Sequence, residues 1–447
     1  MLKKHYLLYV LLIFCCSCSS DEPLSPEEQP HSVENTYAEQ NRWIYGQMNR
    51  NYLWRDDLPD STTCNFNQST KEFFESILSP KDRFSYLTTN DNYKPSNQSR
   101  WGFAYQEYED RVGTKSYYVL YTLSNTDKIT EGDWLYYKSE DHRGIHFSKM
   151  RLTETNLLEE IPESDFLIRS ISGTMQTSSV LRDSIYLVDG DKIGYLCYLE
   201  FDDPQELAPS IKYFKENGIS ELILDLRYNP GGYVSTCLYL CNCIVNESGY
   251  GQVFQQCSYN NLLASFYKNT TGSEYTYTYF KQPSNNSTST IGLGIDGLNL
   301  NRIFILTSRH TASASEATII CLRPYMDVVL IGETTVGKGV GSRNFSNSKY
   351  KYSIQPIVMR YYNAVGETTP DEGLNVDYII PNGYRTAKSE MGKIDEPLLH
   401  KALSIIAPSS FHSIESRANQ TLENSLTPIG EPSYITEFNN KHYNESN

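Results

Sequence analysis

The sequence predicts an α/β protein in which a helical N-terminal segment and a β-rich module precede a larger domain with a parallel sheet. Three observations lead there. Apolar residues follow helical spacing between residues 39 and 90, short β-like runs dominate 91–188, and strands alternate with helices through 189–407. Regular alternation of strand and helix is typical of a parallel sheet covered by helices. The length of 447 residues is ample for several domains.

The first residues follow the pattern of a secretory signal. Lys3 and Lys4 precede an apolar run that is too short to span a bilayer and that ends in small residues and cysteines. This resembles a lipoprotein signal, residues 1–17, cleaved before a lipidated Cys18; Cys16 is the alternative site. Residues 18–38 then form a flexible tether rich in Pro and Glu. We therefore expect an extracytoplasmic protein, lipid-anchored to the outer membrane on its periplasmic or cell-surface side.

Charge and cysteine usage exclude some classes of function. The formal net charge of −15 argues against nucleic acid or an anionic membrane surface as a partner. Beyond the signal lie seven scattered cysteines, which do not form an obvious disulfide framework. Cys237, Cys241 and Cys243 raise the alternative of a metal site. Because no histidine is near them and they share a predicted helix with leucines, we interpret them as buried structural thiols and expect no metal.

The elements before the α/β domain are short. Trp43, Met48, Tyr52 and Trp54 indicate a helix before a turn, and a second apolar group follows between residues 73 and 78. In the next module, runs such as 117–123 and 134–137 read as strands separated by polar turns.

The α/β domain begins with an apolar strand at 193–201. Asp203 is then a predicted N-cap, with a proline at the first helical position, and Gly218 ends this helix before a strand at 222–224. The predicted continuation is a helix at 234–245, a strand at 303–307, a helix at 314–322 and a strand at 328–331. We expect residues 270–290 to be an exposed loop and the polar tail, 408–447, to have little order.

Three segments that follow predicted strands contain the candidate chemistry, since open α/β sheets place their sites at the carboxyl ends of strands. Residues 225–232 (DLRYNPGG) end in Gly231 and Gly232, which allow a sharp turn with exposed amide groups, as an oxyanion hole requires. A tight turn without chemistry is the alternative.

Residues 311–316 (TASASE) place Ser313 where a strand gives way to a helix. Ser313 and Glu316 satisfy the S-x-x-E capping box, so a plain helix cap explains the pair. Capping and catalysis are compatible here, because a serine at such a turn lies beside unpaired amide groups.

Residues 332–339 (GETTVGKG) come close to a phosphate-binding loop, which would indicate an NTPase. Gly339 stands where that motif needs Ser or Thr to hold magnesium, and the residues after it lack helical periodicity. Lys338 could also be a solvated loop residue.

Taken together and in this order, the three segments resemble the carboxyl-terminal processing peptidases, also called tail-specific or tricorn-like serine proteases. The separation of Ser313 and Lys338 matches that of nucleophile and lysine in the family. Further family landmarks are residues 52–54 (YLW), 82–85 (DRFS) and 395–398 (DEPL), so the resemblance runs from about 41 to 406.

The resemblance implies a catalytic domain of the crotonase/ClpP-like type and a serine endopeptidase that needs no cofactor. Ser313 would be the nucleophile and Lys338 the general base, active only as a neutral amine. Amide groups near Gly231, Gly232 and Ala314 would form the oxyanion hole. Substrates would be extracytoplasmic proteins or peptides; the residues leave the oligomeric state and cleavage specificity open.

One position departs from the family pattern. Members often carry a glutamine four residues after the lysine to orient its amine, where this chain has Ser342. The module at 91–188 resembles a PDZ domain that captures carboxyl-terminal tails, through the dipeptides at 102–103 (GF) and 132–133 (GD). A catalytically silent binding protein on the same scaffold is therefore the main rival function.

The histidines offer other mechanisms. His310, three residues before Ser313, is an alternative base. His142 and His146 have a spacing that could suit a metal, but Gly144 interrupts the helix that such a pair needs, so a solvated loop is favoured.

Overall fold

The computed structural model describes residues 33–89, 101–123, 128–169, 178–283, 294, 296–347, 349–350, 352–383, 389–411 and 426–435. The expected signal, Cys16, Cys18 and most of the tether lie outside these residues. Within them, no helix combines the length and apolar character needed to cross a membrane.

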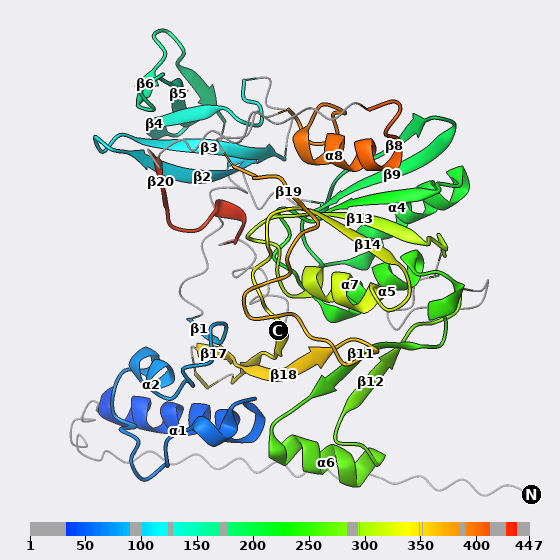
Figure 1. The fold of residues 1–447 in the computed structure, drawn as a ribbon. Helices are drawn as coiled ribbons and strands as arrows, with labels where there is room; N and C mark the ends of the chain where they lie inside the picture. The colour runs from blue at the N-terminus through cyan, green and yellow to red at the C-terminus, as the bar shows by residue number, and fades with distance from the viewer. Residues whose placement is uncertain are drawn as a thin grey trace, which may run out of the picture.

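The N-terminal segment is helical, as predicted. Helices α1 (Val33–Asn51) and α2 (Thr70–Ser76), with the short η1 (Arg55–Asp57) between them, enclose a small core that includes Met48, Tyr52 and Phe73. The segment ends in strand β1 (Tyr86–Thr89), which joins β17 (Tyr352–Gln355) and β16 (Phe345–Ser346) in a three-stranded sheet. This pairing fixes the helices at one end of the α/β domain (Figure 1).

The β-rich module is an antiparallel sheet at the opposite end of the molecule (Figure 1). Its strand order is β20-β2-β3-β4-β5-β6, and β7 also pairs with β5. The strands are β2 (Phe103–Asp110), β3 (Lys115–Thr122), β4 (Trp134–Asp141), β5 (Gly144–Leu152), β6 (Leu158–Glu160), β7 (Phe166–Ile168) and β20 (Leu426–Ile429).

The α/β domain is built on a six-stranded sheet of order β19-β14-β13-β10-β9-β8. All neighbours are parallel except β8 and β9. The strands are β8 (Val180–Val188), β9 (Asp191–Tyr198), β10 (Glu221–Asp225), β13 (Arg302–Thr307), β14 (Asp327–Gly332) and β19 (Tyr378–Ile379). The sequence boundary at residue 188 assigned β8 to the preceding module, whereas it pairs along its length with β9.

Helices cover both faces of this sheet. Leu224, Ile303 and Ile305 point to the side of α4 (Pro204–Asn217), α5 (Val234–Ile244) and α7 (Ala314–Leu322). The alternate residues Ile223 and Phe304 face the core that contains α8 (Pro397–Ile406). Since side chains alternate across a strand, the two faces belong to two separate cores and the domain has three layers.

The start of α4 shows how closely local sequence determines these helices. Asp203 accepts a hydrogen bond from Gln205 N at 2.9 Å, Pro204 opens the helix, and Gly218 ends it in a left-handed conformation. Leu207, Ile211 and Phe214 are fully buried along one face. The predicted cap, stripe and end of this helix are confirmed.

A four-stranded sheet of order β12-β11-β18-β15 lies against the same domain. It contains β11 (Val253–Ser258), β12 (Thr276–Tyr279), β15 (Val340–Ser342) and β18 (Ile357–Tyr362), with η3 (Glu247–Gly249) and α6 (Asn261–Thr271) around it. The prediction of a loop over residues 270–290 is wrong in part, because β12 pairs with β11 inside that range. The alternation of tyrosine and threonine there suits an exposed strand.

The tail is also more ordered than its polar composition predicts. Residues 426–429 form β20, and Tyr434 is 5 % exposed. The large apolar side chains of Leu426 and Tyr434 are buried and anchor a segment that is otherwise mostly polar.

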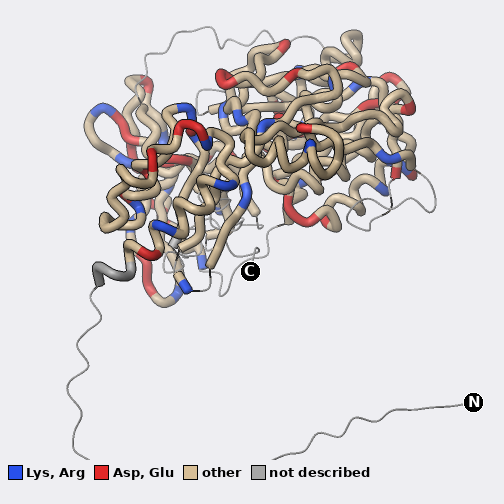
Figure 2. The backbone as a smooth tube through the Cα atoms, turned by 90° about the horizontal axis from the view of Figure 1, so that it is seen from below, with Lys and Arg blue, Asp and Glu red and all other residues tan. Residues whose placement is uncertain are grey.

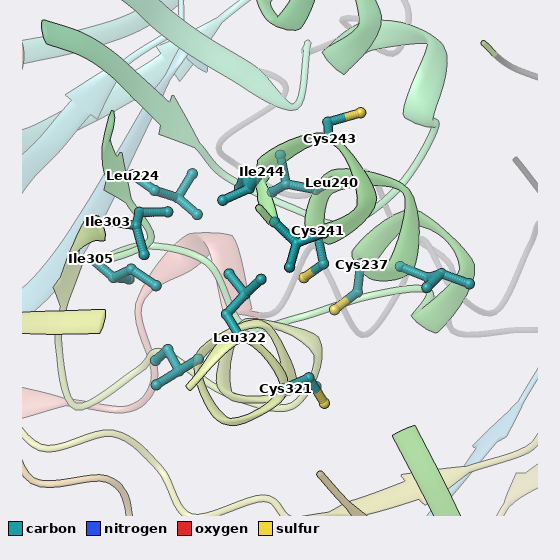
Figure 3. Close-up of a cluster of buried hydrophobic side chains, with 14 of the residues drawn as sticks. Leu224, Cys237, Leu240, Cys241, Cys243, Ile244, Ile303, Ile305, Cys321 and Leu322 are labelled. Carbon is teal, nitrogen blue, oxygen red and sulfur yellow. The ribbon is translucent and has the colours of Figure 1, made fainter. Parts of the chain in front are cut away.

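The cysteines occupy the apolar core. Cys237 and Cys241 lie on the side of α5 that faces α7, Cys321 belongs to α7 itself, and Cys243 lies apart from the other two along α5 (Figure 3). All four are buried. Among the described residues, no three metal-ligating side chains gather in one place.

Basic and acidic residues are interspersed along the chain (Figure 2).

Candidate active site

Ser313 lies at the turn between β13 and α7, which begins at the next residue. Its backbone has φ 57° and ψ −114°, a region that residues with a side chain rarely occupy. Such strain costs on the order of 1–3 kcal/mol and is found mainly at functional sites. The serine is partly exposed, although its neighbours on α7 are buried.

The loop before Ser313 is bound to the loop that follows β10. Thr311 Oγ1 donates to Leu226 O at 2.9 Å, and Ser315 Oγ donates to Asn229 O at 3.0 Å. The N–H of Ala312 donates to the same Asn229 carbonyl at 3.3 Å. These bonds bring two of the three predicted segments together.

Gly231 packs directly on the candidate nucleophile. A Cβ at this position would lie 2.8 Å from Ser313 Cβ and 3.0 Å from Ala314 N, and φ is +113°. Any side chain would push the two loops apart. The N–H of Gly231 already donates to Asn229 Oδ1 at 2.9 Å, so Gly232 and Ala314 are the better candidates for oxyanion donors.

A buried ion cluster supports the loop after β10. Arg227 is 1 % exposed and donates to Asp225 Oδ1 at 2.9 Å and to both oxygens of Glu396 at 2.6 and 2.8 Å. Asp225 also accepts from Tyr195 Oη at 2.8 Å. Glu396 is the N-cap of α8, so the DEPL landmark connects that helix to the loop that carries Gly231.

The third segment follows β14. A Cβ on Gly337 would lie 2.2 Å from Asp371 O, and one on Gly339 would lie 2.7 Å from Thr369 O, so both glycines permit close packing around Lys338. Strand β15 begins two residues after Lys338. A phosphate-binding loop would continue into a helix at this point, which is a finding against the NTPase alternative.

Glu316 joins the serine loop to the lysine loop. Its Oε2 accepts from Ser313 N at 2.9 Å and from Lys338 N at 2.8 Å. Its Oε1 accepts from Gly337 N at 2.8 Å and from Thr335 Oγ1 at 2.5 Å. This fully buried carboxylate therefore holds the backbones of the two candidate catalytic residues on a single oxygen atom.

Tyr361 of β18 makes a second bridge on the carbonyl side. Its hydroxyl lies 3.1 Å from Ser313 O and 2.6 Å from Lys338 O. No motif indicated this residue, because it follows Lys338 on a separate strand. The capping box had singled out Glu316 in the sequence, but that motif indicates a helix start and gives no sign of a contact with Lys338.

The side chain of Lys338 lies beneath the N-terminal segment. Its Nζ is 5.4 Å from the centre of the Phe84 ring. Arg83 donates to Val336 O at 3.2 Å and to Asp371 O at 2.6 Å, so the DRFS landmark is fastened to the lysine loop. Burial lowers the pKa of Lys338 below its usual value, and the carboxylates of Glu316 and Asp82 oppose that shift. Within the described chain, no hydrogen bond joins Lys338 Nζ to the Ser313 hydroxyl.

Within the part of the chain that the structure describes, the Ser342 hydroxyl makes no hydrogen bond to the amine of Lys338. Its hydroxyl accepts from Gln355 Nε2 at 2.9 Å, and Gln355 Oε1 accepts from Tyr86 Oη at 2.6 Å. A glutamine from another strand is therefore hydrogen-bonded to the position where the family often has its own glutamine.

The histidines are placed away from these contacts. Burial lowers the pKa of His310 to about 4, and its Nδ1 is 3.9 Å from Glu431 rather than near Ser313. His146 lies in β5, half-buried and 3.2 Å from Asp141. The expectation of a solvated loop is therefore wrong for His146, which lies in a strand of a hairpin, whereas His142 is exposed in the turn of that hairpin.

Comparison with known proteins identifies the family. The sequence profile of peptidase family S41 matches residues 192–380, and the profile of the S41 N-terminal domain matches residues 39–86. The chain belongs to peptidase family S41. It is thus a member of a family of serine-type peptidases, and Ser313, Glu316 and Lys338 all lie within the matched region.

Curated relatives of this S41 member are carboxyl-terminal processing proteases. One from Synechocystis is 25 % identical over 200 residues, covering 44 % of this chain and 40 % of that protein. Another, from Bacillus subtilis, is 28 % identical over 206 residues, covering 44 % of this chain and 38 % of that protein. The chain thus matches about two fifths of the length of these relatives.

A solved structure supports the fold over a longer range. A Bacteroides fragilis protein described as an S41 protease aligns with a TM-score of 0.66 at 23 % identity. The alignment covers 86 % of this chain and 98 % of that one. The α/β fold predicted from the sequence is confirmed.

Proposed function

We propose that this protein is a serine endopeptidase in which Ser313 is the nucleophile and Lys338 the general base. The observation that carries the proposal is the Glu316 carboxylate, whose Oε2 accepts from the N–H groups of both residues. A carboxylate that holds these two loops together would keep the lysine amine within reach of the serine proton that it must accept.

The reaction divides into two proton-balanced steps. Neutral Lys338 Nζ takes the Ser313 proton while Oγ attacks the peptide carbonyl carbon, and the N–H groups of Gly232 and Ala314 stabilise the oxyanion. The resulting ammonium then protonates the leaving amine as the C–N bond breaks, which leaves an acyl-enzyme. In the second step Lys338 takes a proton from water while the water oxygen attacks the acyl carbon. The ammonium then returns the proton to Ser313 Oγ as the ester bond breaks, which releases the carboxylic acid product. Burial favours the neutral amine that the first step requires.

Ser342 contributes to this proposal through a relay rather than a direct contact. With Gln355 donating to it, the Ser342 hydroxyl keeps its own proton to donate, and Tyr86 fixes the other end of the glutamine amide. Such a chain can limit where the lysine amine lies. A catalytically silent scaffold is the rival function, which is favoured by the departure at Ser342 and by the lack, among the described residues, of a hydrogen bond between Lys338 Nζ and the Ser313 hydroxyl.

Location and substrate follow from the N-terminus and the β-rich module. We propose that lipid on Cys18 anchors the protein to the outer membrane and that its substrates are extracytoplasmic proteins or peptides. The module that contains strands β2 to β7 would act as a PDZ-like binder of carboxyl-terminal tails. No nucleotide or metal cofactor enters the mechanism.

A fluorophosphonate probe tests the proposal, because it labels only an activated serine. We expect the intact protein to be labelled at Ser313, as located by peptide mass spectrometry. Ser313→Ala should abolish labelling, and Ser315→Ala, which removes a hydroxyl bonded to Asn229 O, should retain it. A folded wild-type protein that resists labelling would favour the silent scaffold, and thermal stabilisation by ATP would revive the NTPase alternative.

A further inference from the structure

Residues 426–435, the last that the structure describes, complete the sheet of the β-rich module. Strand β20 pairs antiparallel with β2, with Leu426 opposite Asp110 at one end and Ile429 opposite Glu107 at the other. Because β20 is the outermost strand, its departure would leave the backbone of β2 as an open edge. Figure 1 shows the red segment continuing from β20 toward the catalytic domain.

Contacts with β2 continue past the paired residues. Gln106 Nε2 donates to the carbonyls of Ile429 and Gly430 at 3.1 and 3.3 Å, and Tyr105 N donates to Ser433 Oγ at 2.9 Å. The segment therefore follows β2 from its end back toward its start. This is the manner in which an extended peptide adds to the edge of a sheet.

Two apolar side chains, one near each end, anchor the segment to the rest of the protein. Leu426 is buried in the core that the module shares with the α/β sheet, and the Tyr434 ring packs against the rings of Tyr121 and Tyr228, with ring centres 6.1 and 5.6 Å away. Pro428, between the anchors, is exposed and has no N–H to donate. A short strand with few buried residues is one that another peptide can replace.

The same segment touches both loops of the candidate active site. Tyr228 belongs to the loop that carries Gly231. His310, in the turn that ends in Ser313, lies edge-on to the Tyr434 ring at 6.1 Å and 3.9 Å from Glu431. Occupancy of the β2 edge is thus connected by direct contacts to the loops that position the nucleophile.

We propose that residues 426–435 are an internal ligand of the β2 edge, and that an extended substrate peptide binds there only by displacing them. The peptide would need a bulky aliphatic residue in the place of Leu426 and an aromatic one in the place of Tyr434, because these two large side chains are buried in the apolar core. This inference rests on the proposed peptidase function for the nature of the partner.

A reversible lock tests the exchange. Glu107→Cys with Ile429→Cys places two thiols directly opposite each other across β2 and β20. Oxidation should hold the segment in place, and reduction should free it. The probe is a fluorescein-labelled synthetic peptide of residues 426–435 (LTPIGEPSYI), and anisotropy measures its binding to the full chain in a Ser313→Ala background, which prevents cleavage.

We expect the oxidised double variant to bind the probe at least tenfold more weakly than its reduced form, and Glu107→Cys alone to be insensitive to oxidation. Tyr434→Ala, which removes an anchor, should bind the probe about tenfold more tightly than the parent. Tyr136→Ala, an exposed tyrosine of the same module, is the matched control. Equal binding by the oxidised and reduced forms would overturn the inference, as would no binding by Tyr434→Ala.

Labelling by fluorophosphonate keeps this test separate from the proposed function. A protein that is labelled at Ser313 but shows no effect of the lock refutes the internal ligand alone. Conversely, a protein that exchanges the peptide but is never labelled refutes the Ser-Lys mechanism alone.

Discussion

Replacing Glu316 by glutamine perturbs the junction between the two catalytic loops while keeping the shape of the side chain. In the structure each carboxylate oxygen accepts two hydrogen bonds, Oε2 from Ser313 and Lys338 and Oε1 from Gly337 and Thr335. An amide has a single acceptor oxygen. Whichever way it turns, its NH₂ group therefore faces two donors.

The magnitude follows from the orientation that costs least. If the NH₂ group replaces Oε1, the hydroxyl of Thr335 can turn to accept, and the N–H of Gly337 is left without a partner. A hydrogen bond to a charged group contributes about 1.5–3 kcal/mol, so we expect unfolding to become easier by about that amount. If the same loss falls on the transition state, labelling of Ser313 slows by about 10- to 100-fold, at roughly 1.4 kcal/mol for each factor of ten.

The pH dependence separates an electrostatic role from a structural one. Burial lowers the pKa of Lys338, and the negative charge of Glu316 opposes that shift. Without the charge, the pKa of Lys338 should fall further. Because the neutral amine is the active form, labelling increases as pH rises through this pKa. The midpoint of the increase should therefore move to lower pH in Glu316→Gln.

The assay is the rate constant for fluorophosphonate labelling across the neutral and alkaline range, with thermal unfolding measured on the same samples. Glu367→Gln is the matched control. Glu367 is an exposed glutamate whose Oε2 accepts a hydrogen bond of 3.0 Å from Asn363 Nδ2. A midpoint that stays in place, or moves to higher pH, would refute the electrostatic part of the reasoning. Unchanged stability and rate would refute the junction itself.

Lys338→Arg should abolish labelling as completely as Lys338→Met, because guanidinium keeps its proton at any accessible pH; retained labelling would exclude the lysine as base. Gly231→Ala should slow labelling at least tenfold, since its Cβ would meet Ser313 Cβ at 2.8 Å, whereas Gly251→Ala, also at positive φ but with open space around it, should retain the rate. Cys18→Ala should lose incorporation of a fatty-acid analogue and release the protein from the membrane fraction; label retained in this variant would show that another residue is acylated.

Elements determined by neighbouring residues were predictable from the sequence. The helix expected at 314–322 has those bounds in the structure, because a cap precedes it and apolar residues fill it. The same holds for α4, with Asp203 at its start and Gly218 at its end. Strands β10, β13 and β14 are continuous apolar runs, as expected when both faces of a sheet are covered.

Elements determined by distant residues were not predictable in this way. The place of β8 depends on pairing with β9 rather than on its own pattern, which suits either sheet. The order in the tail depends on contacts of the Tyr434 ring with Tyr121 and Tyr228, which are far away in the sequence. A polar composition predicts little burial, and two anchors suffice to overturn that expectation.

The candidate site shows the same division, with one instructive exception at Glu316. The sequence offered two explanations for Ser313 and Glu316, a helix cap and a catalytic turn, and indicated that the two are compatible in position. In the structure the contact that caps α7, from Ser313 N to Glu316 Oε2, ends on the same oxygen that receives the N–H of Lys338. A single carboxylate can begin the helix and align the lysine because both loops end at the same edge of the parallel sheet. A local capping motif at the carboxyl end of such a strand is therefore compatible with catalysis, and the loop after the next strand is the place to look for its partner.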